Sequence, residues 1–156
     1  MELFTNFPLW AALAAIAFAQ FIKVPLQFIV TKKIDWSLIT STGGMPSSHS
    51  AAVTALTTGI ALEQGVGSPF FAIATVFAVI VMFDASGVRR HAGEQATVLN
   101  KLVADFQRFA EEAKLWPRLD ENAKRKDLKE LLGHKPIEVF FGGLSGILLT
   151  LVLYFL

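Results

Sequence analysis

The chain contains no cysteine, no internal repeat of helical-array length and no low-complexity segment. The missing cysteine excludes disulfides and thiol chemistry, although it says nothing about the compartment. We also expect no secretory signal peptide. Glu2 precedes the first apolar run, no basic residue stands before that run, and no cleavage pattern follows it.

Basic residues are absent from both ends of the chain. All 14 lysines and arginines lie between Lys23 and Lys135, and none falls in the loop around residues 63–68. Because basic loops stay on the cytoplasmic side of a membrane, this distribution places segments 31–50 and 84–135 inside and both termini outside. The net charge is only +1, and acidic neighbours nearly cancel the basic run at 124–126, so we expect no nucleic-acid partner.

Apolar residues, in contrast, are abundant. They make up 53% of the chain, the mean hydropathy is +0.51, and a helical membrane span needs about 20 of them in a row. We therefore predict an all-α fold, with residues 1–156 forming a single domain that is an integral membrane helical bundle in contact with membrane lipids. The protein is expected to be a multi-pass protein of the cell membrane, with about four transmembrane helices at about 7–31, 47–64, 68–88 and 136–156.

The segment at about 89–135 is predicted to be a cytoplasmic helical insert. Residues 92–115 indicate an amphipathic helix, because apolar side chains recur at three- and four-residue spacing. These are Ala96, Leu99, Leu102, Val103, Phe106, Phe109, Ala110 and Ala113. We interpret the helix as a cover for the cytoplasmic end of the bundle. A position in the membrane interface, or pairing with a second subunit in a homo-oligomer, is the alternative. Residues 118–132 favour a short solvated helix.

The stretch Gly-Gly-Met-Pro-Ser-Ser-His-Ser, from Gly43 to Ser50, opens the second apolar helix. Glycine permits close backbone approach, and proline suits the first turn of a helix. The free N–H groups at a helix start, together with the hydroxyls of Ser47 and Ser48, favour an anion-binding site. His49 in the first turn can donate a proton to that anion. The alternative is a polar cap on a membrane helix.

Three further groups of polar residues stand at the other predicted cytoplasmic helix ends. They are Lys23 in the first helix, Arg89 with Arg90 after the third, and His134 with Glu138 at the start of the last. His134 and Glu138 are one helical turn apart, so the carboxylate can orient the imidazole and stabilise its charge. A side chain that extends to the interface is the alternative for Lys23. The sequence does not distinguish the role of Arg89 from that of Arg90.

A different chemistry is conceivable at the same helix ends. Asp84, Glu94 and Glu138 supply three carboxylates, which are ligands that Mg²⁺ prefers. Their spacing is not specific for a metal, and we predict no metal and no cofactor. We interpret His91 as an interfacial residue rather than a catalytic one.

Small residues mark one face of the last helix. Gly142 and Gly146 are four residues apart, which predicts close packing against a neighbouring helix. This feature is structural rather than chemical.

In this order the polar residues resemble the type-2 phosphatidic acid phosphatase superfamily, whose site architecture is shared with vanadium-dependent haloperoxidases. That superfamily has a lysine–arginine element, a Pro-Ser-Gly-His element, and a Ser-Arg element followed by His-x-x-x-Asp. The matching residues are Lys23, then Pro46-Ser47-Ser48-His49, then Arg89 or Arg90 with His134-x-x-x-Glu138. Stretches 44–50, 84–90 and 133–139 are most similar to its divergent branch, and the resemblance covers about residues 20–146.

The resemblance implies a phosphatase that acts on a lipid phosphate or pyrophosphate at the inner leaflet through a phosphohistidine. His134 would attack phosphorus, Glu138 would hold its tautomer, and His49 would protonate the leaving oxygen. The remaining matches, Lys23, Ser47, Ser48, Arg89 and Arg90, would supply the groups that bind the phosphate oxygens. The main alternative is a catalytically weak or inactive relative that binds phosphate or anionic lipid in a structural or regulatory role. A haloperoxidase is a more distant one.

Overall fold

The structure is a computed structural model and describes residues 2–32, 34, 36–41, 43–112 and 133–156. The described residues form helices and no strand. These are α1 (Glu2–Thr5), α2 (Phe7–Thr31), the 3-10 helix η1 (Trp36–Thr40), α3 (Ser48–Gln64), α4 (Pro69–Ser86), α5 (Val88–Glu112) and α6 (Pro136–Phe155). The bounds of α2, α3, α4 and α6 agree within two residues with the four predicted spans. The short helix expected at 118–132 lies outside the described residues.

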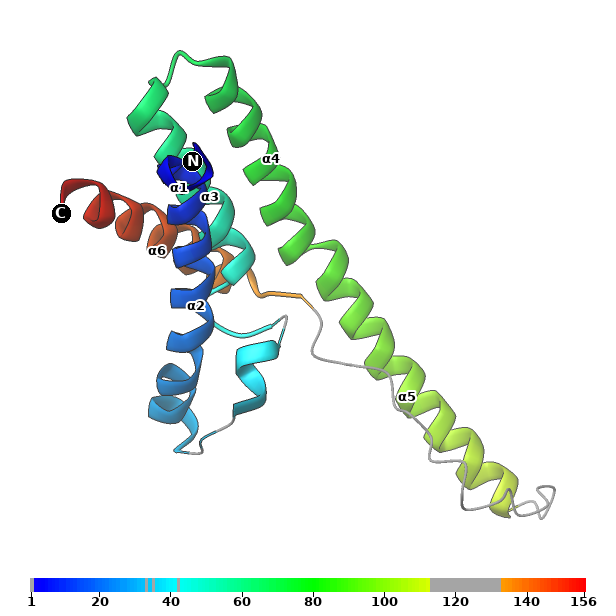
Figure 1. Cartoon of the computed structure of the whole chain (residues 1–156). Coiled ribbons are helices and arrows are strands. Elements are labelled where there is room, and N and C mark those ends of the chain that lie inside the picture. The colour runs from blue at the N-terminus through cyan, green and yellow to red at the C-terminus, as the bar shows by residue number, and fades with distance from the viewer. Residues whose placement is uncertain (1, 33, 35, 42, 113–132) are drawn as a thin grey trace.

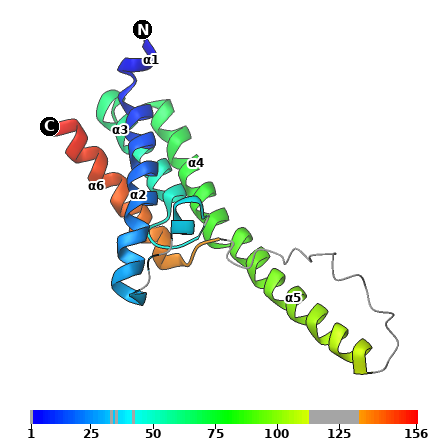
Figure 2. The ribbon, with the colours of Figure 1, turned by 60° about the horizontal axis from the view of Figure 1, so that its bottom comes forward.

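Helix α3 is the central helix, since it packs against α2, α4 and α6 (Figure 1). Its first turn is capped by the Ser47 hydroxyl, which accepts the N–H of Ser50. Both chain termini lie at the same end of the bundle as the turn between α3 and α4 (Figure 2). The beginnings of α3 and α6 and the end of α4 therefore face the opposite end.

Small side chains form the interior, and large apolar ones face outward. The core is a cluster of Ala15 and Ala19 from α2 with Ala51 and Ala55 from α3. The large apolar residues of α4, such as Phe70, are exposed along its length. This distribution is the reverse of that in a soluble domain and is typical of helices that pack closely within lipid.

Three helices of the described chain are long and apolar enough to cross a membrane: α2, the helix that runs from α4 into α5, and α6. Four spans were predicted. The difference is α3, which has 17 residues and carries several serines, threonines and a glutamate.

Helix α6 approaches α3 through its glycines, as the four-residue spacing predicted. A Cβ on Gly142 would overlap the backbone of Ser47, and one on Gly146 would overlap the carbonyl of Ala51 and the hydroxyl of Thr54. The hydroxyl of Thr54 also donates to the carbonyl oxygen of Gly143 at 2.9 Å. This close contact fixes the start of α6 beside the start of α3.

Helix α5 differs from its expected position. It continues in nearly the same direction as α4 and carries the chain away from the bundle (Figures 1 and 2). Leu102, Phe106 and Phe109 on its apolar face are exposed. The interpretation as a cover for the end of the bundle is therefore wrong for the described part of the insert. The physical reason is that Gly87 interrupts the helix without reversing the chain.

Candidate functional site

The candidate site forms where α3 and α6 begin and α4 gives way to α5. The N–H of His134 donates to the carbonyl oxygen of Ala85 in α4 at 2.8 Å. Gly133 has φ +82°, and a Cβ there would overlap the backbone of Arg89 and Arg90. Glycine thus lets the segment before α6 lie directly on the start of α5. His134 comes beside Arg89 although 43 residues separate it from Arg90.

One ring nitrogen of His134 has a hydrogen-bond partner and the other has none within the part of the chain that the structure describes. Its side chain is buried, with 1% of the residue exposed, and its Nδ1 lies 3.1 Å from Oε2 of Glu138. The same oxygen accepts the backbone N–H of Lys135 at 3.2 Å. Since a carboxylate only accepts, the Nδ1 of His134 carries a proton, and Nε2 of the neutral ring has a free lone pair. This Nε2 is buried without a partner among the described residues.

His49 faces His134, with ring centroids 5.7 Å apart and an angle of 67° between the planes. Its Nε2 lies 3.2 Å from Nη1 of Arg89. A guanidinium only donates, so Nε2 of His49 is the acceptor and the neutral ring carries its proton on Nδ1. That Nδ1 is also buried without a partner in the described part of the chain. The two rings and Arg89 therefore form one polar cluster.

The two neighbouring arginines have different partners in the structure. Arg89 bridges His49 and Asp84, whose Oδ2 accepts from its Nε at 2.6 Å. Arg90 instead donates to Oε1 of Glu94 at 2.9 Å. His91 contacts Glu94 as well, at 3.3 Å, and its ring is exposed.

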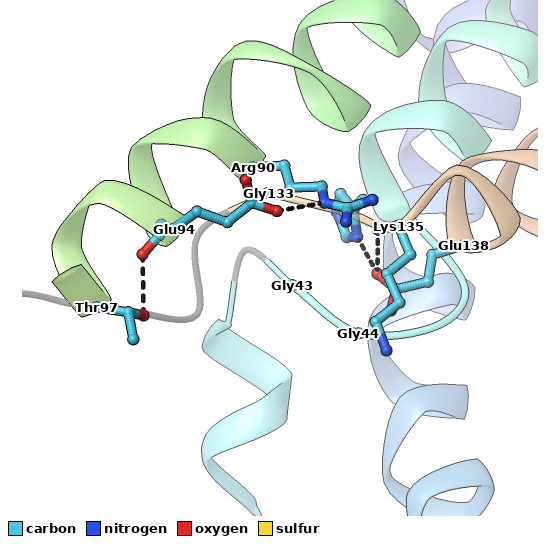
Figure 3. A pocket seen from close by; sticks show the side chains of 10 residues that line it. Gly43, Gly44, Arg90, Glu94, Thr97, Gly133, Lys135 and Glu138 are labelled. Atoms are coloured by element: carbon cyan, nitrogen blue, oxygen red, sulfur yellow. Dashed lines mark hydrogen bonds and ion pairs between the residues drawn. The ribbon is translucent and has the colours of Figure 1, made fainter.

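A cavity of about 240 Å³ opens on one side of this cluster (Figure 3). It lies between the loop at Gly43 and Gly44, the first turns of α5 and the segment 133–138, and Arg90 and Glu94 form part of its wall. It reaches His134 and Glu138 but is not lined by His49 or Arg89. The cavity therefore adjoins the Arg90 side of the cluster.

Lys23 is buried inside the bundle, with 1% of the residue exposed. Its ammonium donates to the carbonyl oxygen of Ser41 at 3.4 Å and lies within electrostatic range of Glu138 and His49. The alternative of a lysine that extends to the interface does not describe this position. Lys23 adds a positive charge to the cluster.

Ser47 and Ser48 differ in which hydrogen-bond donors remain available to an anion. Ser47 is fully buried, its N–H donates to the carbonyl oxygen of Glu138 at 3.0 Å, and its hydroxyl accepts from the backbone and side chain of Ser50. The backbone N–H of Ser47 is thus already used. The N–H groups of Ser48 and His49 begin the helix and have no intrahelical acceptor.

Sequence reasoning missed several partners. Asp84 was considered only as a metal ligand, yet an acid at the end of an apolar run just before two arginines was a signal for an ion pair. The carbonyl of Ser41 that holds Lys23 left no signal in the sequence. The three carboxylates Asp84, Glu94 and Glu138 each pair with a different base. Among the described residues, no three acidic or histidine side chains are grouped as metal ligands.

These observations define a class: an all-helical membrane protein in which a buried lysine and a buried histidine meet a second histidine and a partly exposed arginine at one end of the bundle. The chain matches the Divergent PAP2 family over residues 4–149 and belongs to that family. It is 74% identical over 153 residues to the uncharacterized membrane protein YuiD of Bacillus subtilis (strain 168), covering 98% of this chain and 97% of that protein. No solved structure matches the chain.

Proposed function

We propose that the protein is a membrane phosphatase that hydrolyses a phosphate monoester or a diphosphate, carried by a lipid, through a phosphohistidine on His134. The observation that carries this proposal is the difference between the two ring nitrogens of His134. Glu138 fixes Nδ1 at 3.1 Å, and Nε2 is buried, unpartnered and close to a second histidine. A nucleophile held by an acidic partner beside a proton donor is the arrangement that covalent phosphoryl transfer requires. Membership of the Divergent PAP2 family supports the same chemistry.

In the first step, Nε2 of His134 attacks phosphorus, the N–P bond forms and the bond from phosphorus to the leaving oxygen breaks. A protonated His49 gives its proton to that oxygen. Glu138 stabilises the positive charge that develops on the His134 ring. In the second step, a water molecule attacks the phosphohistidine and loses a proton to His49, which releases phosphate and restores both rings.

Positive charges surround the place where the phosphoryl oxygens would lie. Arg89 shifts its N–H from the Nε2 of His49 to a phosphate oxygen, which frees that nitrogen for the leaving oxygen. Lys23, buried in α2, supplies a second charge, and the N–H groups at the start of α3 are further donors. Donors that are fixed before the reaction stabilise the spread of negative charge in the transition state.

The protein is proposed to cross the membrane four times, with α3 as the fourth span. Its 17 residues give about 25 Å of helix, and α2, α4 and α6 surround it. All lysines and arginines lie between Lys23 and Lys135 in the sequence, and both termini lie at the end of the bundle away from the starts of α3 and α6. This charge bias favours a site on the cytoplasmic side, at the depth of lipid headgroups.

The test is phosphate release by purified full-length protein from a panel of lipid phosphates and lipid diphosphates, with and without a chelator. We expect release that the chelator does not reduce, competitive inhibition by vanadate, and loss of turnover in His134→Ala. Full activity in His134→Ala contradicts the phosphohistidine mechanism. A wild-type protein that binds vanadate but releases no phosphate supports the alternative, a non-catalytic phosphate-binding membrane protein.

A further inference from the structure

Asp84 is the acidic residue in the last turn of α4, a helix that carries no other charged residue. A carboxylate is unfavourable at this place, because the C-terminal end of a helix carries a partial negative charge. The chemistry proposed above gives Asp84 no part, so its contacts must explain it.

Those contacts lead directly to the histidine cluster. Oδ2 of Asp84 accepts from Nε of Arg89 at 2.6 Å, and Nη1 of the same guanidinium lies 3.2 Å from Nε2 of His49. A guanidinium is planar and rigid, so a carboxylate that fixes Nε also fixes the direction of Nη1. The side chains of Arg89 and Asp84 are 45% and 37% exposed. Ion pairs this exposed add little to folding stability, so orientation is the main consequence.

The interruption between α4 and α5 makes this contact geometrically available. Ion pairs on a continuous helix join residues three or four apart, whereas Asp84 and Arg89 are five apart. Gly87 stands between them with φ −106° and ψ −86°. A Cβ there would lie 2.9 Å from the carbonyl oxygen of Phe83. Glycine thus permits the turn that brings the Arg89 side chain back to Asp84.

The same turn of α4 also positions the proposed nucleophile. Ala85, the residue after Asp84, accepts the N–H of His134 at 2.8 Å. One short stretch of backbone therefore holds both Arg89 and His134. Arg90 has its own acidic partner, Glu94, and this second ion pair is part of the cavity wall.

We propose that Asp84 is a positioning residue that aims the guanidinium of Arg89 at an oxyanion bound beside His49. The proposal deepens the function proposed above and rests on it for the presence of an anion. It does not depend on turnover.

The direction in which Asp84→Asn changes anion affinity distinguishes a positioning role from a purely electrostatic one. Removing a negative charge near an anion site strengthens anion binding if only the local charge matters. Loss of orientation weakens it, because Arg89 keeps its charge and no longer points at the anion. The Asp84→Asn variant therefore has opposite expected effects in the two cases.

The experiment measures the dissociation constant of orthovanadate by calorimetry on the full-length protein in detergent. Four variants are compared with the wild type: Asp84→Asn, Arg89→Ala, the double variant, and Glu63→Gln, at the other end of α3, as the control. We expect Arg89→Ala to weaken binding on the order of 10–100-fold, as when a hydrogen bond to a charged group is lost. Asp84→Asn should weaken it on the order of tenfold, and Glu63→Gln should leave it within about twofold.

In the Arg89→Ala background, Asp84→Asn should have almost no further effect, because the residue it orients is gone. Unchanged or tighter binding in Asp84→Asn overturns the proposal, as does an equal loss in Glu63→Gln or full additivity in the double variant. If Asp84→Asn does not fold, Asp84→Glu takes its place, with several-fold weaker binding expected and wild-type affinity overturning the proposal. Vanadate binding without turnover contradicts the phosphatase alone, and no binding by the wild type contradicts both.

Discussion

The Nδ1 of His134, just before α6, lies 3.1 Å from Oε2 of Glu138 in the first turn of that helix. The same carboxylate oxygen accepts the N–H of Lys135, and the carbonyl oxygen of Glu138 accepts the N–H of Ser47. Glu138 thus connects the proposed nucleophile to the start of α3, which carries His49. Its position depends on the backbone of two helices and not on its own side chain alone.

The Glu138→Gln variant should lose turnover by roughly 10²–10⁴-fold, in the range that control of a histidine tautomer supplies. An amide can present its NH₂ group to Nδ1 and so favour the tautomer with the proton on Nε2, which cannot attack. The rate constant for phosphate release measures the effect, and Glu63→Gln at the other end of the bundle is the control. Unchanged turnover in Glu138→Gln contradicts this part of the mechanism.

The two histidines should respond differently to the leaving group. His49→Ala should lower turnover on the order of 10²–10⁴-fold on a lipid phosphate, because the leaving alkoxide loses its proton donor. With a nitrophenyl phosphate the loss should be smaller, since a phenolate leaves without help. His134→Ala should be inactive on both substrates. An equal loss in His49→Ala on both would mean that His49 acts other than as an acid.

The sequence predicted the helices of this site well and their arrangement less well. Apolar runs and caps are local signals, so the bounds of α2, α3, α4 and α6 agree with expectation within two residues. The pairing of His134 with Glu138 was also predictable from their four-residue spacing, although His134 lies just before α6 and not within it. The direction of α5 was not, since it depends on the backbone angles of a single residue, Gly87.

Contacts between distant segments explain the remaining differences. Arg89 and Arg90 could not be distinguished by sequence, because their roles differ only through contacts with His49 and Glu94 in the folded chain. The sequence also suggested that the Ser47 N–H was free, whereas Glu138 accepts it across 91 residues of chain. Such backbone pairings leave no residue pattern.

Packing of α6 on α3 should be sensitive to a single methyl group. Gly146→Ala places a Cβ against the carbonyl of Ala51 and the hydroxyl of Thr54. We expect this overpacking to lower the free energy of unfolding by roughly 1–3 kcal/mol. Gly67→Ala is the control, because a Cβ there meets nothing within 4 Å. Melting in detergent measures the difference, and equal stability of the two variants contradicts close contact between α3 and α6.

The orientation of the bundle makes a final prediction. Both termini lie at the end opposite the histidine cluster, and all lysines and arginines lie between Lys23 and Lys135. The positive-inside rule then places the C-terminus outside and the insert in the cytoplasm. A green fluorescent protein fused after Leu156 should stay dark, whereas one inserted near residue 120 should fluoresce. Alkaline phosphatase fusions at the same positions should give the reverse pattern. Fluorescence from the C-terminal fusion would mean that the bundle is inverted, and the histidine cluster would then meet its substrate from the outer leaflet.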